Sequence, residues 1–226
     1  ILMNESPGAL FTGLGAAAAV LVLIFQDSIR GFLASIQMAS YDLIRIGDWI
    51  SLPKLQADGY VEEISLTTIK VRNFDKTITT IPATAVLTEG VKNWRGMEEA
   101  GARRCKKHLR INMDTIKFCS DSNLNNLKTQ GFVNQDIDEN SKLTNLELYR
   151  RYCESYLQKH PKTQEQKFLL LVRQLQSDQH GLPLEFYFFL KTIKWKEYEN
   201  ISSNIFDHLI ASLNSFELKA YQRSSN

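Results

Sequence analysis

The residues that could perform catalysis or bind a metal are few and scattered. The histidines and cysteines stand alone, outside the H-E-x-x-H and C-x-x-C spacings that bring metal ligands together: His108, His160, His180, His208, Cys105, Cys119 and Cys153. Asp207 and His208 adjoin on a predicted helix, where a surface or capping role is far more common than a proton relay. G-x-S-x-G and phosphate-loop motifs are absent. We therefore expect no enzyme, no bound metal and no cofactor.

One glycine-rich run has the spacing of a dinucleotide site. Gly13-Leu14-Gly15-Ala16-Ala17-Ala18 fits the G-x-G-x-x-A pattern, which requires a strand before it. The preceding residues, Asn4 to Gly8, are polar and turn-forming, so this interpretation is rejected.

The same glycines lie in an uncharged stretch from Ser6 to Gln26. About 20 such residues, at roughly 1.5 Å each, span the hydrocarbon core of a bilayer as a helix. A signal peptide would need a basic start and a cleavage site, and a buried core helix rarely needs so long a run. We expect a membrane-spanning helix, and the first residue, Ile1, suggests a longer chain with segments upstream.

The elements around this stretch follow from its small residues and from the pattern after it. Small side chains let helices approach closely in lipid, so Gly13, Gly15, Ala17 and Ala18 predict packing on neighbouring helices. Asp27 interrupts the run, and residues 29–39 then repeat apolar positions at helical spacing. We expect a kink and a second, amphipathic helix, or else one longer bent helix. Basic residues after the span weakly place its C-terminal side in the cytoplasm.

The chain taken as a whole has the average composition of a soluble protein. Its 226 residues carry a net charge of +2, and the mean hydropathy is −0.25. Residues 43–52, 59–73 and 77–81 alternate apolar and polar positions, with turns at 57–59 and 75–76, which predicts a compact β-barrel. Residues 92–110 hold seven basic and two acidic side chains. We expect residues 92–110 to form a solvated loop and the start of a strand, in preference to a nucleic-acid surface.

The second half predicts a separate module. Residues 109–118, 168–175 and 184–195 have strand patterns, with a turn at 179–181, and helical stretches fall near 123–130 and 143–159. From Tyr198 to Phe216, apolar residues recur every three or four positions, as on one face of a closing helix. The order β, α, β, β, α predicts a two-layer α+β sandwich.

These motifs together resemble the MscS family of mechanosensitive channels over the whole chain. The likeness lies in the small-residue run Leu14 to Ala19, Gln26, Arg45-x-Gly47-Asp48-Trp49-Ile50, Gly59-x-Val61-x-x-Ile64-Ser65-x-Thr67-Thr68, Asp75-Lys76 and Ile81-Pro82. Asn93-Trp94-Arg95-Gly96-Met97, Val172-Arg173-Gln174-Leu175, Gly181-Leu182-Pro183-Leu184-Glu185 and Ile205-Phe206-Asp207-His208 resemble its YbdG-like, miniconductance-type branch.

The resemblance implies a fold class, an assembly and a location. It implies an α+β chain with one transmembrane pore helix, a small Sm-like β-barrel and a two-layer α/β sandwich. The implied domains are 1–41, the pore helix with its kinked amphipathic extension, 42–96, the β-domain, and 97–226, the C-terminal α/β domain. It further implies a homoheptamer in the bacterial inner membrane, with a cytoplasmic C-terminal part. Its partners would be lipid and permeant ions, and no nucleic acid.

The resemblance also implies roles for residues of the span. The pore-lining positions would be Ala16, Ala19, Val20, Leu23 and Asp27, the helix-packing positions Gly13, Gly15, Ala17 and Ala18, and the kink Gln26 and Asp27. The family's two bulky pore rings fall on Ala19 and Leu23, and Ala19 is smaller than usual. Asp27 replaces the family's kink glycine and would place a ring of carboxylates near Arg30, which would bias ion preference. Ala83 replaces the family's usual Asn after Pro82.

The function implied is a channel opened by membrane tension during hypoosmotic stress. Two alternatives stay open at this point: a membrane-anchored osmosensing scaffold that conducts nothing, and an Sm-like RNA-binding module. Single-channel recording separates the first from a channel, and salt-dependent RNA binding by residues 41–226 would favour the second.

Overall fold

The computed structural model describes residues 7–134, 142–164 and 167–223. The chain divides into two compact units, Ile1–Gly96 and Met97–Asn226. Each unit has its own hydrophobic core, so each is described by itself.

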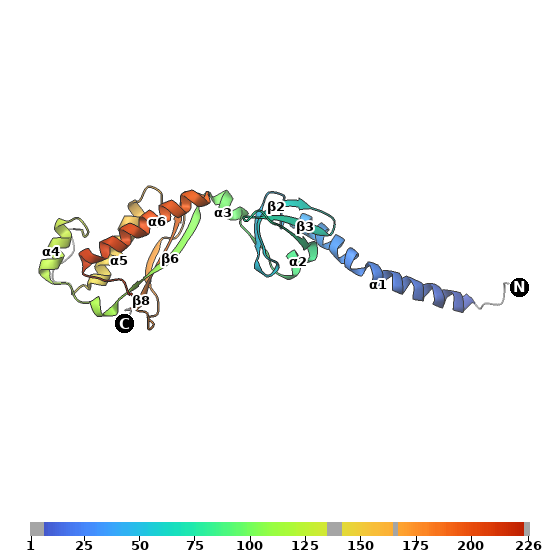
Figure 1. Cartoon of the computed structure of the whole chain (residues 1–226), viewed down its shortest axis with the longest axis horizontal. Coiled ribbons are helices and arrows are strands. Elements are labelled where there is room, and N and C mark those ends of the chain that lie inside the picture. The colour runs from blue at the N-terminus through green and yellow to red at the C-terminus, as the bar shows by residue number, and fades with distance from the viewer. Residues whose placement is uncertain (1–6, 135–141, 165–166, 224–226) are drawn as a thin grey trace. The chain divides into compact units, whose positions relative to one another are not determined.

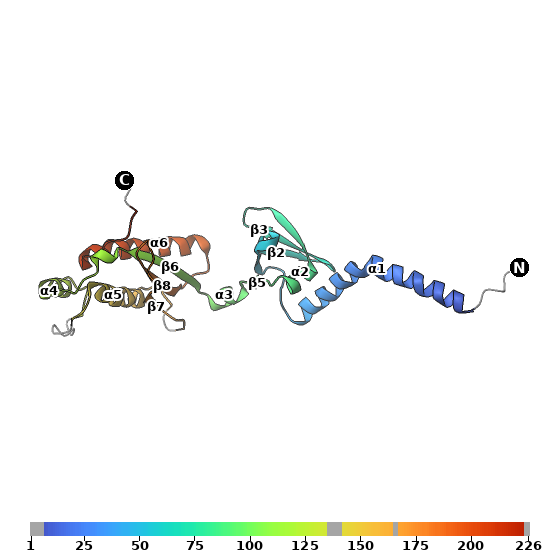
Figure 2. The same ribbon diagram turned by 90° about the horizontal axis from the view of Figure 1, so that it is seen from below.

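The first unit begins with one long helix, α1, Pro7–Ser40 (Figure 1). It is continuous over 34 residues and changes direction part-way along, as Figure 2 shows. Of the two predicted alternatives, the single bent helix is therefore the correct one. Phe11–Ser40 is long and apolar enough to cross a membrane, and its most apolar stretch is wholly exposed.

A five-stranded antiparallel sheet follows. The strands are β1, Trp49–Leu52, β2, Ala57–Ile64, β3, Thr68–Asn73, β4, Ile78–Pro82, and β5, Lys92–Asn93. A 3-10 turn, Pro53–Leu55, and a short helix, α2, Ala83–Thr88, connect them. The sheet order is β4-β3-β2-β1-β5, with β4 and β5 at its two edges. Within the described residues this sheet is open, so the closed barrel that was predicted is not seen.

In this sheet one strand prediction and one turn prediction are wrong, and the other turn prediction is confirmed. Residues 59–73 are two strands, because the chain reverses at Ser65–Thr67 without glycine or proline to signal it. The supposed turn at residues 57–59 lies inside β2. A Cβ at Gly59 would lie 2.0 Å from the carbonyl oxygen of Arg72, so this glycine allows two strands to approach closely. The turn at residues 75–76 is present, with Lys76 at φ 75°.

The core of the first unit lies between the sheet and two helices. Alternate strand positions point inward, as the strand period requires, and residues from α1 and α2 cover them. The buried apolar residues are Ala34, Met38, Ile44, Ile50, Leu52, Ala57, Val61, Ile69, Val71, Ile81, Ala83 and Val86.

The second unit follows a short helix, α3, Arg95–Ala100. Its strands are β6, Arg103–Ile111, β7, Leu171–Gln174, and β8, Leu182–Leu190, in the antiparallel order β6-β8-β7. Its helices are α4, Asp121–Thr129, α5, Asn145–Lys159, and α6, Trp195–Ser212, with 3-10 turns at Met113–Thr115 and Leu213–Phe216. The first strand begins and ends earlier than predicted, and Trp195 starts a helix where a strand end was predicted.

The sheet of the second unit carries its helices on one face. α6 contacts β6, and α5 contacts β7, above inward side chains of the central strand such as Phe186 and Phe188 (Figures 1 and 2). The predicted stripe on the closing helix is buried or half-buried: Tyr198, Ile201, Ile205, Leu209, Leu213 and Phe216. Periodicity identified this helix because only one of its faces packs on the sheet.

Candidate functional site

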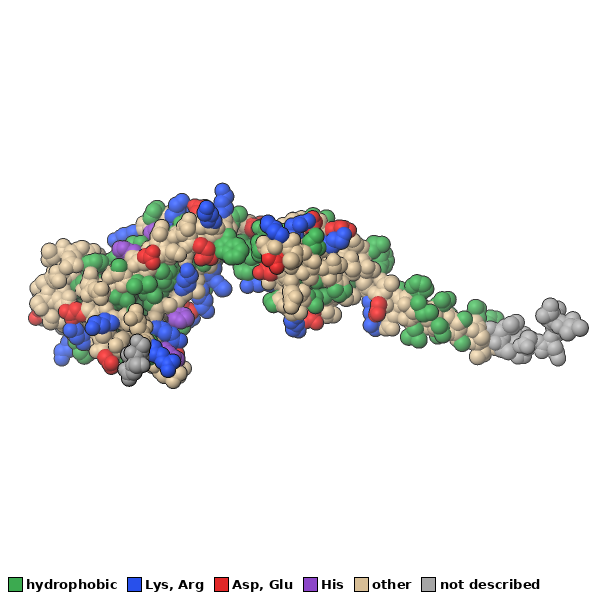
Figure 3. Space-filling model, in the orientation of Figure 1, with side chains coloured by type: hydrophobic (Ala, Val, Ile, Leu, Met, Phe, Trp, Pro, Cys, Tyr) green, Lys and Arg blue, Asp and Glu red, His purple; other side chains and the backbone are tan. Residues whose placement is uncertain are grey.

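The first candidate site is the exposed first half of α1. Ala16, Ala19, Val20, Leu23 and Asp27 recur at spacings of three or four residues, so they share one face of the helix. All five are exposed within the single chain, with Val20 at 56% and Leu23 at 69%. Figure 3 shows apolar side chains along this segment. An exposed apolar helix of this length requires lipid or other helices around it.

The small residues of α1 lie mainly beside this face. Gly15, Ala17 and Ala18 fall on other sides of the helix, whereas Gly13, three positions before Ala16, lies at its edge. The described part of the chain places no atom within 4 Å of a Cβ built on Gly13 or Gly15. These positions therefore leave room for another helix to approach.

The two predicted kink residues differ in exposure. Gln26 is half-buried, whereas the side chain of Asp27 is 99% exposed. Arg30 Nη1 lies 3.9 Å from Asp27 Oδ1, so the expected carboxylate and guanidinium groups are neighbours on the helix surface.

The second half of α1 packs on the sheet through small residues that sequence analysis did not single out. Gly31, Ala34 and Met38 are buried, and the hydroxyl of Ser35 donates to the carbonyl of Leu66 at 2.8 Å. A Cβ on Gly31 would lie 3.1 Å from Thr67. The apolar positions of the predicted amphipathic helix lie away from this packed face and are exposed: Ile29, Phe32, Leu33, Ile36 and Ala39. The signal that could have revealed this face is the i, i+3, i+4, i+7 spacing of Gly31, Ala34, Ser35 and Met38.

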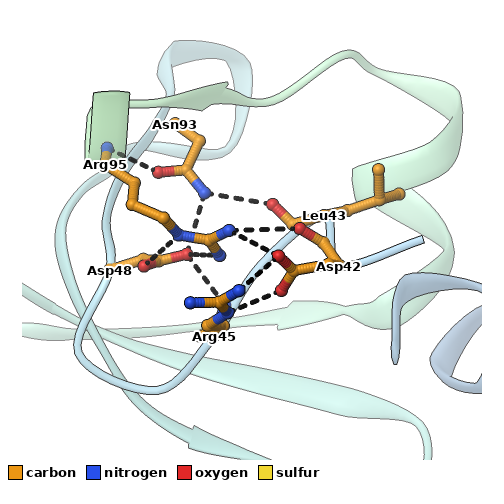
Figure 4. Close-up of polar contacts among 6 residues, drawn as sticks. All are labelled: Asp42, Leu43, Arg45, Asp48, Asn93 and Arg95. Atoms are coloured by element: carbon orange, nitrogen blue, oxygen red, sulfur yellow. Dashed lines mark hydrogen bonds and ion pairs between the residues drawn. The ribbon is translucent and has the colours of Figure 1, made fainter. Parts of the chain in front are cut away.

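A polar cluster lies where α1 joins the sheet (Figure 4). We call its members, Asp42, Arg45, Asp48, Asn93 and Arg95, the Asp48 cluster. The carboxylate of Asp48 accepts four hydrogen bonds. Arg95 donates two of them, Nε to Oδ1 at 2.9 Å and Nη2 to Oδ2. The side-chain amide of Asn93 and the backbone N–H of Arg45 each donate at 2.8 Å.

The electrostatics of this cluster favour charged carboxylates. Burial disfavours the charge on Asp48, but Arg95, the backbone N–H of Arg45 and the Asn93 amide outweigh it and hold the pKa of Asp48 below its ordinary value. The hydrogen bond from Arg45 lowers the pKa of Asp42. Both carboxylates are therefore ionised at neutral pH.

An aromatic pair supports the cluster from the neighbouring strand. Trp94, between Asn93 and Arg95, stacks on Trp49 with ring centroids 4.6 Å apart, and its backbone N–H donates to the Trp49 carbonyl. Trp94, where the chain leaves the sheet after β5, is thus held against Trp49, where the chain enters the sheet at β1. Asp48 and Arg95 each lie in a motif of the resemblance. Because 47 positions separate them, the sequence did not indicate that they contact each other.

The basic residues of 92–110 have partners within the chain. Lys92 lies over Trp94, Arg103 over Tyr198 and Arg104 over Tyr187, whereas Arg95, Lys106, Lys107 and Arg110 contact Asp48, Glu185, Ser202 and Asp178. Each side chain thus has a structural role, which accounts for the local excess of positive charge.

The described residues contain no group of three or more His, Cys, Asp or Glu that could hold a metal. Among the histidines, His208 accepts or donates a hydrogen bond at 2.6 Å with the hydroxyl of Tyr152 and stacks on Tyr156. Burial raises the pKa of the Cys105 and Cys119 thiols. The imidazole of His208 and the thiols of Cys105 and Cys119 thus have the surroundings of packed structural side chains.

Comparison with known proteins finds a family model and relatives that match this chain. Residues 27–96 match the family model described as mechanosensitive ion channel, beta-domain. The small-conductance mechanosensitive channel MscMJ of Methanocaldococcus jannaschii is 35% identical over 85 residues, which is 38% of this chain and 24% of the relative. The uncharacterized MscS family protein YhdY of Bacillus subtilis is 21% identical over 202 residues, 89% of this chain and 46% of the relative.

Solved structures extend the likeness to nearly the whole chain. The structure of Arabidopsis thaliana MSL1 has a TM-score of 0.68 at 14% identity, covering 96% of this chain and 66% of that one. The closed state of Helicobacter pylori MscS has a TM-score of 0.67 at 13% identity, covering 99% and 74%. The likeness shows an MscS-like fold, with an N-terminal apolar helix and antiparallel sheets.

These relatives are longer than the chain. The chain spans 24% and 46% of the lengths of the two curated relatives. The family model thus covers residues 27–96, and the solved structures show an MscS-like fold over nearly the whole chain.

Proposed function

We propose that this chain forms the pore helix and vestibule of an MscS-family channel that membrane tension opens during hypoosmotic stress. The observation that carries the proposal is the order of two elements: an exposed apolar helix runs directly into a domain that matches the channel β-domain model. In this proposal residues 1–41 line and frame the pore, 42–96 form the β-domain, and 97–226 form the C-terminal α/β domain. The chain belongs to the YbdG-like, miniconductance-type branch and performs no enzymatic reaction.

The assembly is a homoheptamer in the bacterial inner membrane, surrounded by lipid, with its C-terminal part in the cytoplasm. A ring of one helix per subunit places small side chains against neighbours and apolar side chains toward the lumen. Gly15, Ala17 and Ala18 serve the first purpose, and Gly13 packs at the edge of the pore face. The ring thereby buries the apolar surface that a single chain exposes.

The gate is an apolar constriction at Leu23, assisted by Val20. Because Ala16 and Ala19 are small, the lumen is wider above the gate, and the narrow ring excludes water until tension widens it. Below the gate, Asp27 faces the pathway beside Arg30 and favours cations at the cytoplasmic mouth. The bend at Gln26 and Asp27 turns the helix toward the β-domain.

The test is single-channel recording of the full-length protein in a host without its own mechanosensitive channels. Leu23→Ser places a hydroxyl in the apolar ring, so the gate wets more readily and opens at lower tension. Leu21→Ser is the matched control, because Leu21 is a similarly exposed leucine on the opposite side of α1.

Two results would overturn the proposal. If the wild-type protein gives no tension-activated current, the proposal fails and the protein is the non-conducting scaffold. An unchanged threshold in Leu23→Ser, or an equal shift in Leu21→Ser, removes Leu23 from the gate.

A further inference from the structure

The helix α1 ends with a residue in a conformation that usually selects glycine. Asp42 has φ 52°, and its backbone N–H donates to Ala39 while that of Leu43 donates to Met38. This paired pattern is the Schellman ending, whose left-handed position is most often glycine because a Cβ is unfavourable there. An aspartate at this position needs a reason beyond ending the helix.

The carboxylate of Asp42 supplies that reason, because it joins two arginines from different parts of the first unit. Arg45, three residues on, donates from Nε at 2.6 Å and from Nη2. Arg95, 53 residues away, donates from Nη1 to Oδ2 at 3.0 Å and to the Asp42 carbonyl at 3.3 Å. The contact with Arg45 is local, whereas the contact with Arg95 fastens the end of α1 to the chain leaving the sheet (Figure 4).

The two carboxylates that hold Arg95 differ in strength. The side chain of Asp48 is 8% exposed and accepts four hydrogen bonds, so it fixes the guanidinium in place. The side chain of Asp42 is 50% exposed, where water competes for its contacts. Asp48 thus holds Arg95 more firmly, and the contact of Arg95 with Asp42 is the weaker and more exposed of the two.

We propose that Asp42 is a positioning residue for gating, which holds the end of α1 against Arg95 in the resting channel. The inference rests on the proposed function, in which α1 lines the pore. If the helix tilts during opening, a contact made only in the resting conformation stabilises that conformation by its own free energy. Losing the contact therefore favours opening.

The experiment compares two substitutions with opposite effects on the backbone. Asp42→Asn keeps a side chain that tolerates the left-handed conformation, whereas Asp42→Gly also removes the unfavourable Cβ. Both abolish the ion pair with Arg95. In patch-clamp recordings of the full-length channel, both lower the tension of half-opening, and the closed-to-open equilibrium shifts by roughly twofold to fivefold per subunit, as expected for an exposed pair.

Two matched controls separate this contact from nearby effects. Arg45→Gln removes only the local partner of Asp42 and leaves the midpoint tension close to wild type. Asp75→Asn removes a carboxylate from the β3–β4 turn, where its partner is Thr77, and tests for loss of charge alone. A midpoint that is unchanged or raised in Asp42→Asn, shifts of opposite sign in Asp42→Asn and Asp42→Gly, or an equal shift in either control would overturn the inference.

A second readout does not depend on conduction. Hydrogen exchange of the purified full-length protein should be faster at Leu43, whose N–H ends the helix, in Asp42→Asn than in wild type, and unchanged in Asp75→Asn. Equal exchange in Asp42→Asn and wild type overturns the contact itself. If wild type passes no current but exchange at Leu43 still rises in the variant, the proposed channel function has failed and the contact stands.

Discussion

At the scale of single residues, Asp48 has the most demanding surroundings in the first unit. Its carboxylate is buried and its four hydrogen bonds come from Arg45, Asn93 and Arg95. Removing one member of a buried ion pair leaves the other without compensation, which typically costs about 3 kcal/mol or more. We therefore expect Asp48→Asn to lower the unfolding temperature of the detergent-purified protein at neutral pH.

The pH dependence of this effect follows from the pKa of Asp48. Because the folded-state pKa lies below the unfolded value of about 4, the stabilisation is present above that pH and is lost as pH falls through the folded-state pKa. The gap in unfolding temperature between wild type and Asp48→Asn should therefore close as the pH falls below about 4. A gap that is independent of pH would show that the charge of Asp48 does not carry the effect.

Asp27 carries a prediction about ion preference. Its side chain is 99% exposed, with Arg30 Nη1 3.9 Å from its Oδ1, so Asp27→Asn should leave folding unchanged. Recorded across a salt gradient, the variant should show a reversal potential shifted toward the equilibrium potential of the anion, because a ring of negative charges has been removed. Asp207→Asn, on α6, is the control. Unchanged reversal potential and conductance would contradict the assignment of Asp27 to the ion pathway.

At the scale of elements, β2 and β3 approach each other at Gly59. A methyl group there would overlap the backbone of Arg72, and a strand backbone cannot retreat as a flexible side chain can. We expect Gly59→Ala to destabilise the first unit by about 3 kcal/mol or more. Thermal unfolding and hydrogen exchange over β2 and β3 measure it.

Gly96→Ala provides the comparison for this substitution. Gly96 lies in α3 with open space around its Cβ position, so alanine there should be neutral or slightly stabilising. An unfolding temperature of Gly59→Ala equal to that of Gly96→Ala would contradict the close approach.

The elements that sequence predicted well are those with a regular apolar period. α6 was found because Tyr198, Ile205 and Leu209 fall on one buried face. The turn between β2 and β3 was missed because Ser65-Leu66-Thr67 carries no glycine or proline, and Gly59 suggested a turn although it serves a strand contact. Local propensity describes the chain's own conformation, whereas both features depend on a neighbouring strand.

At the scale of the whole molecule, the chain forms two units with separate hydrophobic cores. Sequence periodicity predicts many of the helices and strands of each unit, but not the contacts between residues far apart in the sequence. The exposed span is visible in the composition of residues 6–26, which carry no charged side chain. The Asp48 cluster is not, since its members come from the segment between α1 and β1, from β5 and from the start of α3, and only folding brings them together. The packing of α1 through Gly31 was hidden for the same reason, because it depends on Thr67.

The outer strand β6 has a consequence for how copies of this chain meet. Apart from a bridge between Ile111 and Ala220, its outer edge has no strand beside it in the described part of the second unit. Two copies paired antiparallel about Lys107 would place Arg104 opposite Arg110. Like charges along a strand edge oppose edge-to-edge extension into fibres. We therefore expect the outer edge of β6 to resist pairing with the same edge of another copy.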